Sequence, residues 1–350
     1  MSGVQHVEVG RDEGDQRLDR WFRRRFPHVQ QGRIEKMCRK GEIRVDGGRV
    51  KPATRVAPGQ SVRIPPLPDP EEGAAPRPAP ARVREADATM MRAAVIYRDD
   101  HVIALNKPPG LPVQGGSGQT RHVDALAEAL RFGLDEPPRL VHRLDKDTSG
   151  VLVMARTRAV AAALTRAFRA RETRKIYWAA VAGVPNPRMG TIRFGLVKAP
   201  GHGAKGEGEK MICVHPDRVD ATPGAKRAVT DYAVLSALGR RASWVALVPV
   251  TGRTHQLRAH MAGIGHPIVG DGKYGGSGQE NLGDGWGAQL GGEISRKLHL
   301  HARALTLDHP VTGARLNLVA PLPPHMARTW AALGWSEAEV PADPFAEDAP

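Results

Sequence analysis

One polar run of this 350-residue chain, residues 142–150, contains the residue types that covalent chemistry requires. Asp145 lies inside this run, which has apolar residues on both sides, so we expect a loop that two strands hold in place. His142, Arg143 and Lys146 place positive charge around the carboxylate, and this favours its ionised form. An ionised carboxylate in a cationic pocket is suited to a nucleophile that acts on a polyanion.

A second dense run, residues 251–260, contains two arginines that are five residues apart on a helix predicted to begin near Thr254. Arg253 and Arg258 should therefore point in different directions and need not share a role. Between the two runs, Lys175 and Tyr177 fall on one face of a predicted strand, because strand side chains alternate with a period of two.

The residue types that bind metals or cofactors do not form a recognisable set. Five histidines lack carboxylate or Cys partners at ligand spacing, so we expect no metal site; they are His255, His260, His266, His299 and His301. Cys38 and Cys213 lie far apart, and we expect neither a disulfide nor zinc. The glycines of residues 115–118 match neither dinucleotide-binding nor P-loop spacing, so no cofactor is predicted.

The composition indicates a folded, basic protein. Hydrophobic residues make up 41% of the chain and the net charge is +14, which argues for a polyanionic partner. Residues 1–64 hold 15 Lys/Arg against 8 Asp/Glu, a surplus of +7, half of the total. Charge alone fits DNA, RNA or anionic lipid equally well. Because no apolar run approaches the length of a membrane span and the N-terminus lacks signal-peptide features, we expect a cytoplasmic protein.

The N-terminal block has the pattern of two helices followed by a small hairpin sheet. Apolar residues recur at helical spacing in residues 17–26 and again from Ile34 to Cys38, and Gly41 is a plausible stop. Four basic residues of this block are candidates for phosphate contacts: Arg33, Lys36 and Lys40, which form a stripe on the second helix, and Arg44 on the first strand.

The organisation that we predict has four parts. They are a small basic domain at 15–64, a Pro/Ala-rich linker at 65–90, a large domain at 91–335 and a solvated acidic tail at 336–350, with five acids and no Lys or Arg. Hairpin signals recur in the large domain, and a helix is predicted from Ala159 to Arg171. The glycine-rich insert at 277–292 has no role that we can assign.

The run His-Arg-Leu-Asp-x-x-Thr-Ser-Gly resembles the catalytic loop of the pseudouridine synthases that modify structured RNA. The resemblance implies that Asp145 is the catalytic residue and that Arg143 fills the space left by a flipped nucleotide, with His142 beside it. It also implies that Tyr177 contacts the target base, that Leu257 lies beneath this base, and that Arg258 pairs with Asp145. The family uses no cofactor.

Residues 15–64 resemble the S4-like RNA-binding domain, through Arg17-Leu18-Asp19 and the run from Arg39 to Gly47. With Gln114-Gly115-Gly116-Ser117-Gly118 ahead of the Asp145 loop, this pattern is most similar to the C-type subgroup acting on large-subunit ribosomal RNA. The resemblance implies an α+β fold, in which the S4-like domain precedes a mixed, mainly antiparallel sheet with flanking helices. It implies 23S ribosomal RNA or its precursor as partner, without DNA or membrane, and we expect a monomer.

Three other functions remain open at this point. The same chemistry could act on another structured RNA such as tRNA. A glycosidase would require a second carboxylate at a defined separation from Asp145, and only Asp147 is close in sequence. A non-catalytic RNA-binding or ribosome-assembly protein would leave both dense motifs without a purpose. Whether Asp145 attacks the sugar or the base is not decided by the sequence.

Overall fold

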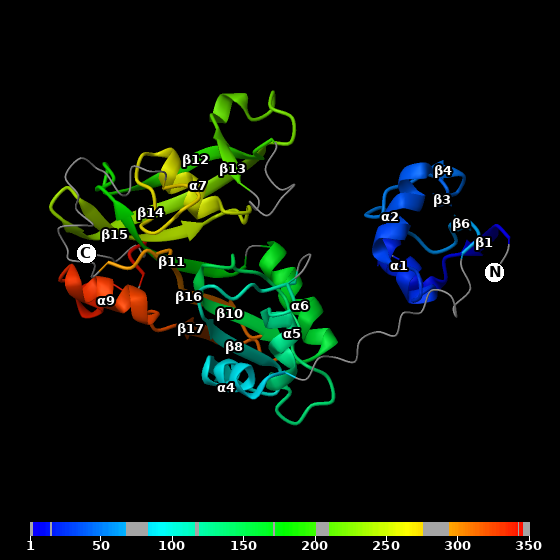
Figure 1. Cartoon of the computed structure of the whole chain (residues 1–350), viewed down its shortest axis with the longest axis horizontal. Helices are drawn as coiled ribbons and strands as arrows, with labels where there is room; N and C mark the ends of the chain where they lie inside the picture. The colour runs from blue at the N-terminus through cyan, green and yellow to red at the C-terminus, as the bar shows by residue number, and fades with distance from the viewer. Residues whose placement is uncertain are drawn as a thin grey trace. The chain divides into compact units, whose positions relative to one another are not determined.

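The computed structural model describes residues 3–14, 16–67, 83–115, 119–170, 172–200, 210–275, 294–341 and 343–345. The chain divides into two compact units, residues 1–82 and 83–350, which are labelled by element in Figure 1. Our expectations for residues 116–118 and for the insert at 277–292 fall outside the described residues.

Unit 1 contains the two predicted helices followed by short strands, but β1, η1 and β2 precede the helices. Its described elements are β1 (Gln5–Glu8), η1 (Arg11–Glu13), β2 (Gln16–Arg17), α1 (Leu18–Arg25), α2 (Gln31–Lys40), β3 (Arg44–Val45), β4 (Gly48–Arg49), β5 (Arg55–Val56) and β6 (Ser61–Ile64). The apolar spacing seen in the sequence produces one core, in which Trp21 and Phe22 of α1 pack with Ile34 of α2. Gly41 ends α2 at a φ of 72°, a left-handed conformation that favours glycine.

Unit 2 contains the two dense motifs. Its described elements are α4 (Glu85–Ala93), β7 (Val95–Arg98), β8 (Val102–Lys107), α5 (Val123–Leu126), η2 (Ala127–Leu130), β9 (Arg139–Leu140), β10 (Ser149–Ala155), α6 (Arg158–Ala170), β11 (Arg174–Ala182), β12 (Met189–Lys198), β13 (Met211–Val214), η3 (Pro216–Arg218), β14 (Lys226–Leu238), β15 (Ala242–Pro249), α7 (Gln256–Gly263), β16 (Leu300–Asp308), β17 (Arg315–Val319), α9 (Pro324–Ala332) and η5 (Glu337–Glu339).

Within the described residues, an 11-stranded sheet forms the body of unit 2. Its main path runs β13-β12-β14-β15-β11-β16-β10-β8-β7, while β17 pairs with β16 and β9 with β10. Of the strand pairs in the described parts of this sheet, β10 with β16 is parallel and the others are antiparallel. The predicted α+β fold with a mixed, mainly antiparallel sheet is therefore confirmed.

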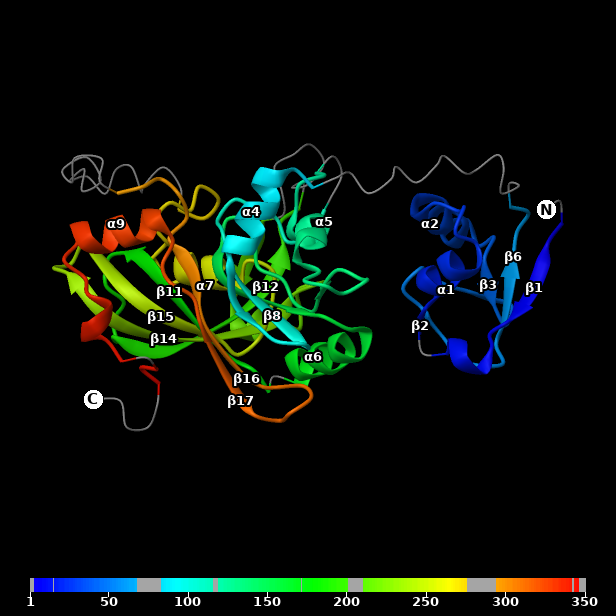
Figure 2. The same cartoon turned by 90° about the horizontal axis from the view of Figure 1, so that it is seen from below.

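Helices cover both faces of this sheet, because alternate residues of each strand join different apolar clusters. On β11, Trp178 packs with Trp330 of α9, whereas Ala179 belongs to the cluster that contains Leu257 of α7. On β10, the neighbouring residues Leu152 and Val153 likewise belong to two different apolar clusters, one on each face of the sheet. Figure 1 shows α7 and α9 on different sides of β15, and Figure 2 shows the same sheet from below. The active-site strands are thus enclosed by packing from two sides.

Two of the predicted boundaries are wrong. Residues 85–93, expected in the linker, form α4 of unit 2, with Ala88 and Met91 buried. The described part of the expected solvated tail packs on unit 2 instead: Phe345 contacts the cluster of Trp330, and Asp343 lies 2.6 Å from Arg174. Val340 and Phe345 are the apolar residues of this acidic segment that pack on unit 2.

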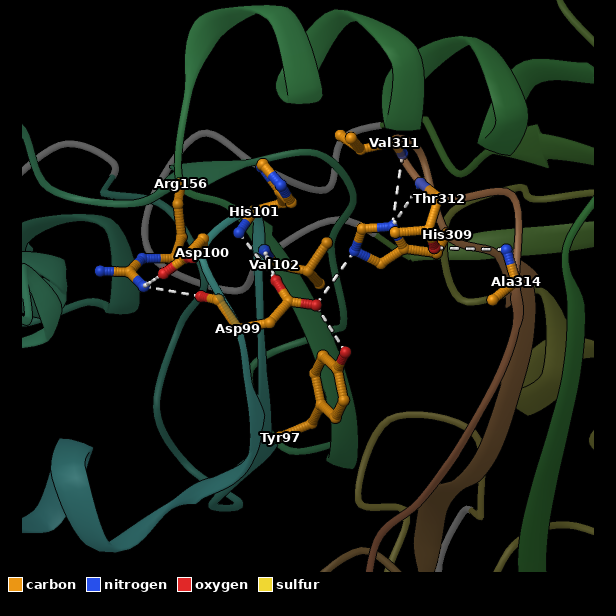
Figure 3. Close-up of polar contacts among 10 residues, drawn as sticks. All are labelled: Tyr97, Asp99, Asp100, His101, Val102, Arg156, His309, Val311, Thr312 and Ala314. Atoms are coloured by element: carbon orange, nitrogen blue, oxygen red, sulfur yellow. Dashed lines mark hydrogen bonds and ion pairs between the residues drawn. The ribbon is translucent and has the colours of Figure 1, made fainter.

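A polar cluster ties the turn between β7 and β8 to the end of β16 (Figure 3). Asp99 accepts hydrogen bonds from the Tyr97 hydroxyl and from His309 Nε2, the latter at 3.0 Å. His309 Nδ1 accepts the Thr312 N–H at 3.0 Å, so the ring proton must lie on Nε2. Arg156 donates to the Asp99 carbonyl at 2.6 Å. The cluster joins the start of β8 to the end of β16, at the end of β10 that lies away from the Asp145 loop.

Close approach of β10 to β16 requires glycine at position 150. Gly150 has a φ of 108°, and a Cβ built there would lie 2.2 Å from the Ala302 carbonyl oxygen. We expect Gly150→Ala to lower the free energy of unfolding of unit 2 by about 2 to 5 kcal/mol, through backbone strain and a clash. Urea unfolding, followed by tryptophan fluorescence, measures the loss.

Gly110→Ala is the matched control for this prediction. Gly110 also has a positive φ, 82°, but nothing lies within 4 Å of an added Cβ. Gly110→Ala should therefore lower the free energy of unfolding only through backbone strain, by about 1 to 2 kcal/mol. Equal losses of unfolding free energy for the two variants would show that the clash with Ala302 does not add to the backbone strain.

Candidate active site

A cavity of about 900 Å³ opens between the loop that contains Asp145 and the start of α7. Both dense motifs of the sequence line it, together with Gln114 from the loop after β8 and Tyr177 from β11. The sheet therefore brings together residues that are more than one hundred positions apart.

Backbone contacts hold the Asp145 loop against β8. Lys107 is fully buried, and its Nζ donates to the Lys146 carbonyl at 3.0 Å and to the Leu111 carbonyl at 2.9 Å. Burial lowers the pKa of Lys107 to about 7, against the attraction of Asp147 and then of Asp145. The carbonyl next to the candidate nucleophile is thus anchored to a core strand.

His142 holds the start of the same loop, and it does so as a neutral ring. Its Nε2 accepts the Val153 N–H at 2.9 Å, and its ring packs on Phe168 with centroids 4.4 Å apart. Burial, helped by the positive charge of Lys175, lowers the pKa of His142 to about 3. Our expectation that His142 adds positive charge around Asp145 is therefore wrong.

Asp145 lies at the cavity with one third of its side chain exposed (33%). Among the described residues, His255 lies beside this carboxylate, with Nε2 4.0 Å from Asp145 Oδ2, and the two form an ion pair only when the imidazole is protonated. Arg143 is exposed at the cavity, and its Nη1 donates to Gln114 Oε1 at 3.3 Å. Arg143 and Asp145 both line the cavity, and the sequence did not indicate a role for His255.

Arg258 binds a different carboxylate from the one we expected. Its Nε and Nη2 each lie 2.7 Å from an oxygen of Asp271, in a bidentate pair whose two side chains are buried. The pKa of Arg258 is raised: burial acts to lower it, but Asp271 raises it and Asp145 adds a smaller attraction. The expected ion pair between Arg258 and Asp145 is therefore wrong, because Asp271 occupies the guanidinium fork.

An apolar surface lies beside the carboxylate. Leu257 and Leu300 are buried in one cluster and line the cavity, and the half-buried Tyr177 packs against them. Burial and, to a smaller extent, the charge of Asp145 raise the pKa of Tyr177, so its phenol stays protonated at neutral pH. This surface can accommodate a planar, uncharged ring next to Asp145.

The four basic candidates of unit 1 are all exposed, in agreement with the helical spacing. Lys40 lies 3.7 Å from Glu42, and Arg44 donates to the Gly41 carbonyl at 3.1 Å. Arg33 and Lys36 complete the stripe on α2.

Sequence reasoning missed three residues that support the site, Lys107, His255 and Tyr274. Lys107 could have been found as a charged residue at the end of a strongly apolar run, residues 102–105. The other two gave no local signal, since their contacts come from tertiary structure. In the parts of the chain that the structure describes, no group of His, Cys, Asp or Glu is arranged to hold a metal ion. No helix there is long and apolar enough to cross a membrane.

Residues 101–263 match the family model of RNA pseudouridylate synthase, and residues 16–62 match the S4 domain. A ribosomal large subunit pseudouridine synthase C of Vibrio cholerae serotype O1 is 34% identical over 326 residues, covering 92% of this chain and 95% of the relative. The chain belongs to the RNA pseudouridylate synthase family. The protein of the same name in Escherichia coli K12 is 34% identical over 331 residues, 91% of this synthase and 93% of the relative.

Solved structures agree with this family. Human RNA pseudouridylate synthase domain containing 4 is 34% identical, with a TM-score of 0.57, and covers 71% of the synthase and 95% of its own chain. Human RNA pseudouridylate synthase domain containing 1 is 27% identical, with a TM-score of 0.50. The match covers 67% of the synthase and 86% of the human chain. The resemblance based on the two dense motifs and the S4-like block is confirmed.

Proposed function

We propose that this synthase converts uridine to pseudouridine in large-subunit ribosomal RNA, with Asp145 as the nucleophile and without a cofactor. The observation that supports it best is Asp145 itself, a carboxylate on an anchored loop beside an apolar surface that fits a base. The relatives named for the ribosomal large subunit support the RNA target.

The reaction breaks the bond between N1 of uracil and C1′ of the sugar, turns the uracil, and joins its C5 to C1′. The proton of C5 is released to solvent, and N1 takes up a proton. No atom is gained or lost overall, so a nucleophile that holds the intermediate can be sufficient. A base in folded RNA must be flipped out to reach Asp145. In this proposal Arg143 fills the vacated position, and Tyr177 and Leu257 contact the flipped base.

The cavity favours isomerisation over hydrolysis of a glycosidic bond. Asp145 is the one carboxylate among the described residues that line it. Asp147 is exposed outside this lining, and Asp271 is already paired with Arg258. A glycosidase of the common type needs two carboxylates across the scissile bond.

Two measurements test the proposal. Pseudouridines are mapped in ribosomal RNA from cells with and without the gene, and the purified full chain is given 23S ribosomal RNA or tRNA with tritium at C5 of uridine. We expect at least one missing pseudouridine in 23S RNA, and tritium release from that RNA. Release from tRNA alone would contradict the target, and no release from any RNA would contradict the chemistry.

RNA affinity should depend on the basic stripe of α2. Changing Arg33, Lys36 and Lys40 together to Gln removes three exposed charges. If each contacts a phosphate, the slope of log affinity against log salt should fall by about 2. Affinity for 23S RNA is measured by filter binding at salt concentrations from about 50 to 200 mM, a range over which such slopes are usually determined.

The control is a triple variant that removes the same number of positive charges from α1 instead of α2. Arg20, Arg23 and Arg24 are also exposed, and their change to Gln should alter the slope by less than about 1. Equal slopes for the two triple variants would mean that net charge acts at long range and that α2 has no special contact with RNA.

A further inference from the structure

Tyr274 and His255 form a hydrogen-bonded chain that leads to Asp145. The Tyr274 hydroxyl lies 3.0 Å from His255 Nδ1, and on the opposite side of this ring His255 Nε2 lies 4.0 Å from Asp145 Oδ2. His255 lines the cavity, whereas Tyr274 lies behind it and does not. Tyr274 therefore acts on the reaction indirectly, and His255 is its hydrogen-bonded link to the cavity.

The backbone favours one direction of donation between Tyr274 and His255. Tyr274 Oη accepts the Met211 N–H at 2.8 Å, and donation of its own proton to His255 Nδ1 completes its hydrogen bonding. A neutral imidazole that accepts at Nδ1 must carry its proton on Nε2. The ring therefore presents an N–H to the Asp145 carboxylate.

Charge and burial keep His255 in this neutral form. The groups that face it are Asp145, Arg258, Lys273 and Asp271, besides Tyr274. Burial, with Arg258 and Lys273, lowers its pKa more than Asp145 and Asp271 raise it. At neutral pH the chain from Tyr274 to Nε2–H is thus complete.

The buried pair of Arg258 and Asp271 holds Tyr274 in place. Asp271 Oδ1 accepts the Tyr274 N–H at 3.1 Å, and the Arg258 guanidinium lies 5.1 Å from the centre of the Tyr274 ring. This ring is therefore fixed from its backbone and from one face. Arg258, which also lines the cavity, thus helps to hold Tyr274 in place.

We propose that His255 and Tyr274 are positioning residues for Asp145, with Tyr274 fixing the ring of His255 so that Nε2–H orients the carboxylate for attack. The inference rests on the proposed role of Asp145 as nucleophile. A separation of 4.0 Å is too long for a hydrogen bond, but catalytic hydrogen bonds are often long before substrate binds and tighten in the complex.

The first test is Tyr274→Phe in the full chain, with tritium release from 23S RNA measured from pH 5 to 9. Loss of the hydroxyl removes a donor that stabilises neutral His255, so its pKa rises and the imidazolium forms at higher pH. We expect kcat to fall about tenfold at pH 7 with KM changed less than about twofold, and the acidic limb to move to higher pH.

Variants of His255 separate positioning from simple loss of packing. His255 has a φ of 49°, which Asn tolerates, so His255→Asn keeps the backbone but is too short to reach Asp145. Adding Tyr274→Phe to His255→Asn should cause no further loss, because the two act in series. His255→Gln, whose amide N–H reaches further, should recover part of the activity.

Tyr232→Phe is the matched control. Tyr232 is buried on β14, and its hydroxyl donates to the Pro187 carbonyl at 2.9 Å, apart from this chain. It should leave the pH profile unchanged. A profile for Tyr274→Phe like that of Tyr232→Phe, or losses that multiply in the double variant, would overturn the proposal. Asp145→Asn is measured in parallel: if it is inactive, such a result rejects only the positioning role, and if it is active, the nucleophile itself is wrong.

Discussion

Asp145→Asn should lower the rate of uridine isomerisation by about 10⁴-fold or more, while the affinity for RNA changes little. The amide keeps the shape of the side chain but removes the nucleophilic oxygen that would hold the intermediate. The anchoring of the loop depends on the Lys146 carbonyl and on His142, so the fold should be retained. Tritium release from C5 of uridine in 23S RNA measures the rate.

Asp147→Asn is the control for this variant. Asp147 lies two residues along the same loop, but its side chain is exposed and outside the cavity. Its change should alter the rate by less than about tenfold, through its distant effect on Lys107. If Asp147→Asn abolished the reaction and Asp145→Asn did not, the nucleophile would have to be reassigned.

Arg258→Met should lower the free energy of unfolding of unit 2 by about 3 to 5 kcal/mol, because it leaves Asp271 buried and without its charge partner. Methionine preserves much of the packing volume, so the loss reports mainly the unpaired carboxylate. Urea unfolding at pH 7 measures it.

Two further variants show whether the buried charge is the cause. Arg253→Met removes an exposed guanidinium that donates to the Arg227 carbonyl at 3.3 Å, and it should change stability by less than about 0.5 kcal/mol. Adding Asp271→Asn to Arg258→Met should restore part of the loss, since an amide oxygen can still accept the Tyr274 N–H without a charge. Similar losses for Arg253→Met and Arg258→Met would contradict this explanation.

The sequence predicted the elements of this synthase better than its charge pairs. Helix α6 and the buried strand β10 follow from local periodicity, which one segment reveals by itself. The partner of Arg258 could not be derived in this way, because Asp145 and Asp271 lie in different loops and only the folded chain shows which one the guanidinium reaches. The neutrality of His142 has the same origin, since burial by Phe168 depends on tertiary packing.

The boundaries that were predicted wrongly depend on weak patterns. Helix α4 buries only Ala88 and Met91 among its nine residues, and it follows a Pro/Ala-rich segment, so its periodicity hardly differs from that of a linker. In the tail, acidic composition hid the few apolar residues that pack, among them Phe345. Composition describes solvation of a segment on average, but single side chains decide where it docks.

The parallel contact between β10 and β16 makes completion of the active site a late event in folding. On one edge β10 pairs with β8, which lies less than 50 residues earlier in the chain. On the other edge Gly150 pairs with Ala302, and the antiparallel strands β11 to β15 lie between them in sequence. Contacts of such long sequence separation form slowly. On the ribosome, the cavity therefore lacks Leu300 and β10 lacks its pairing with β16 until nearly all of unit 2 has emerged, so we expect a nascent chain to gain activity only after that point.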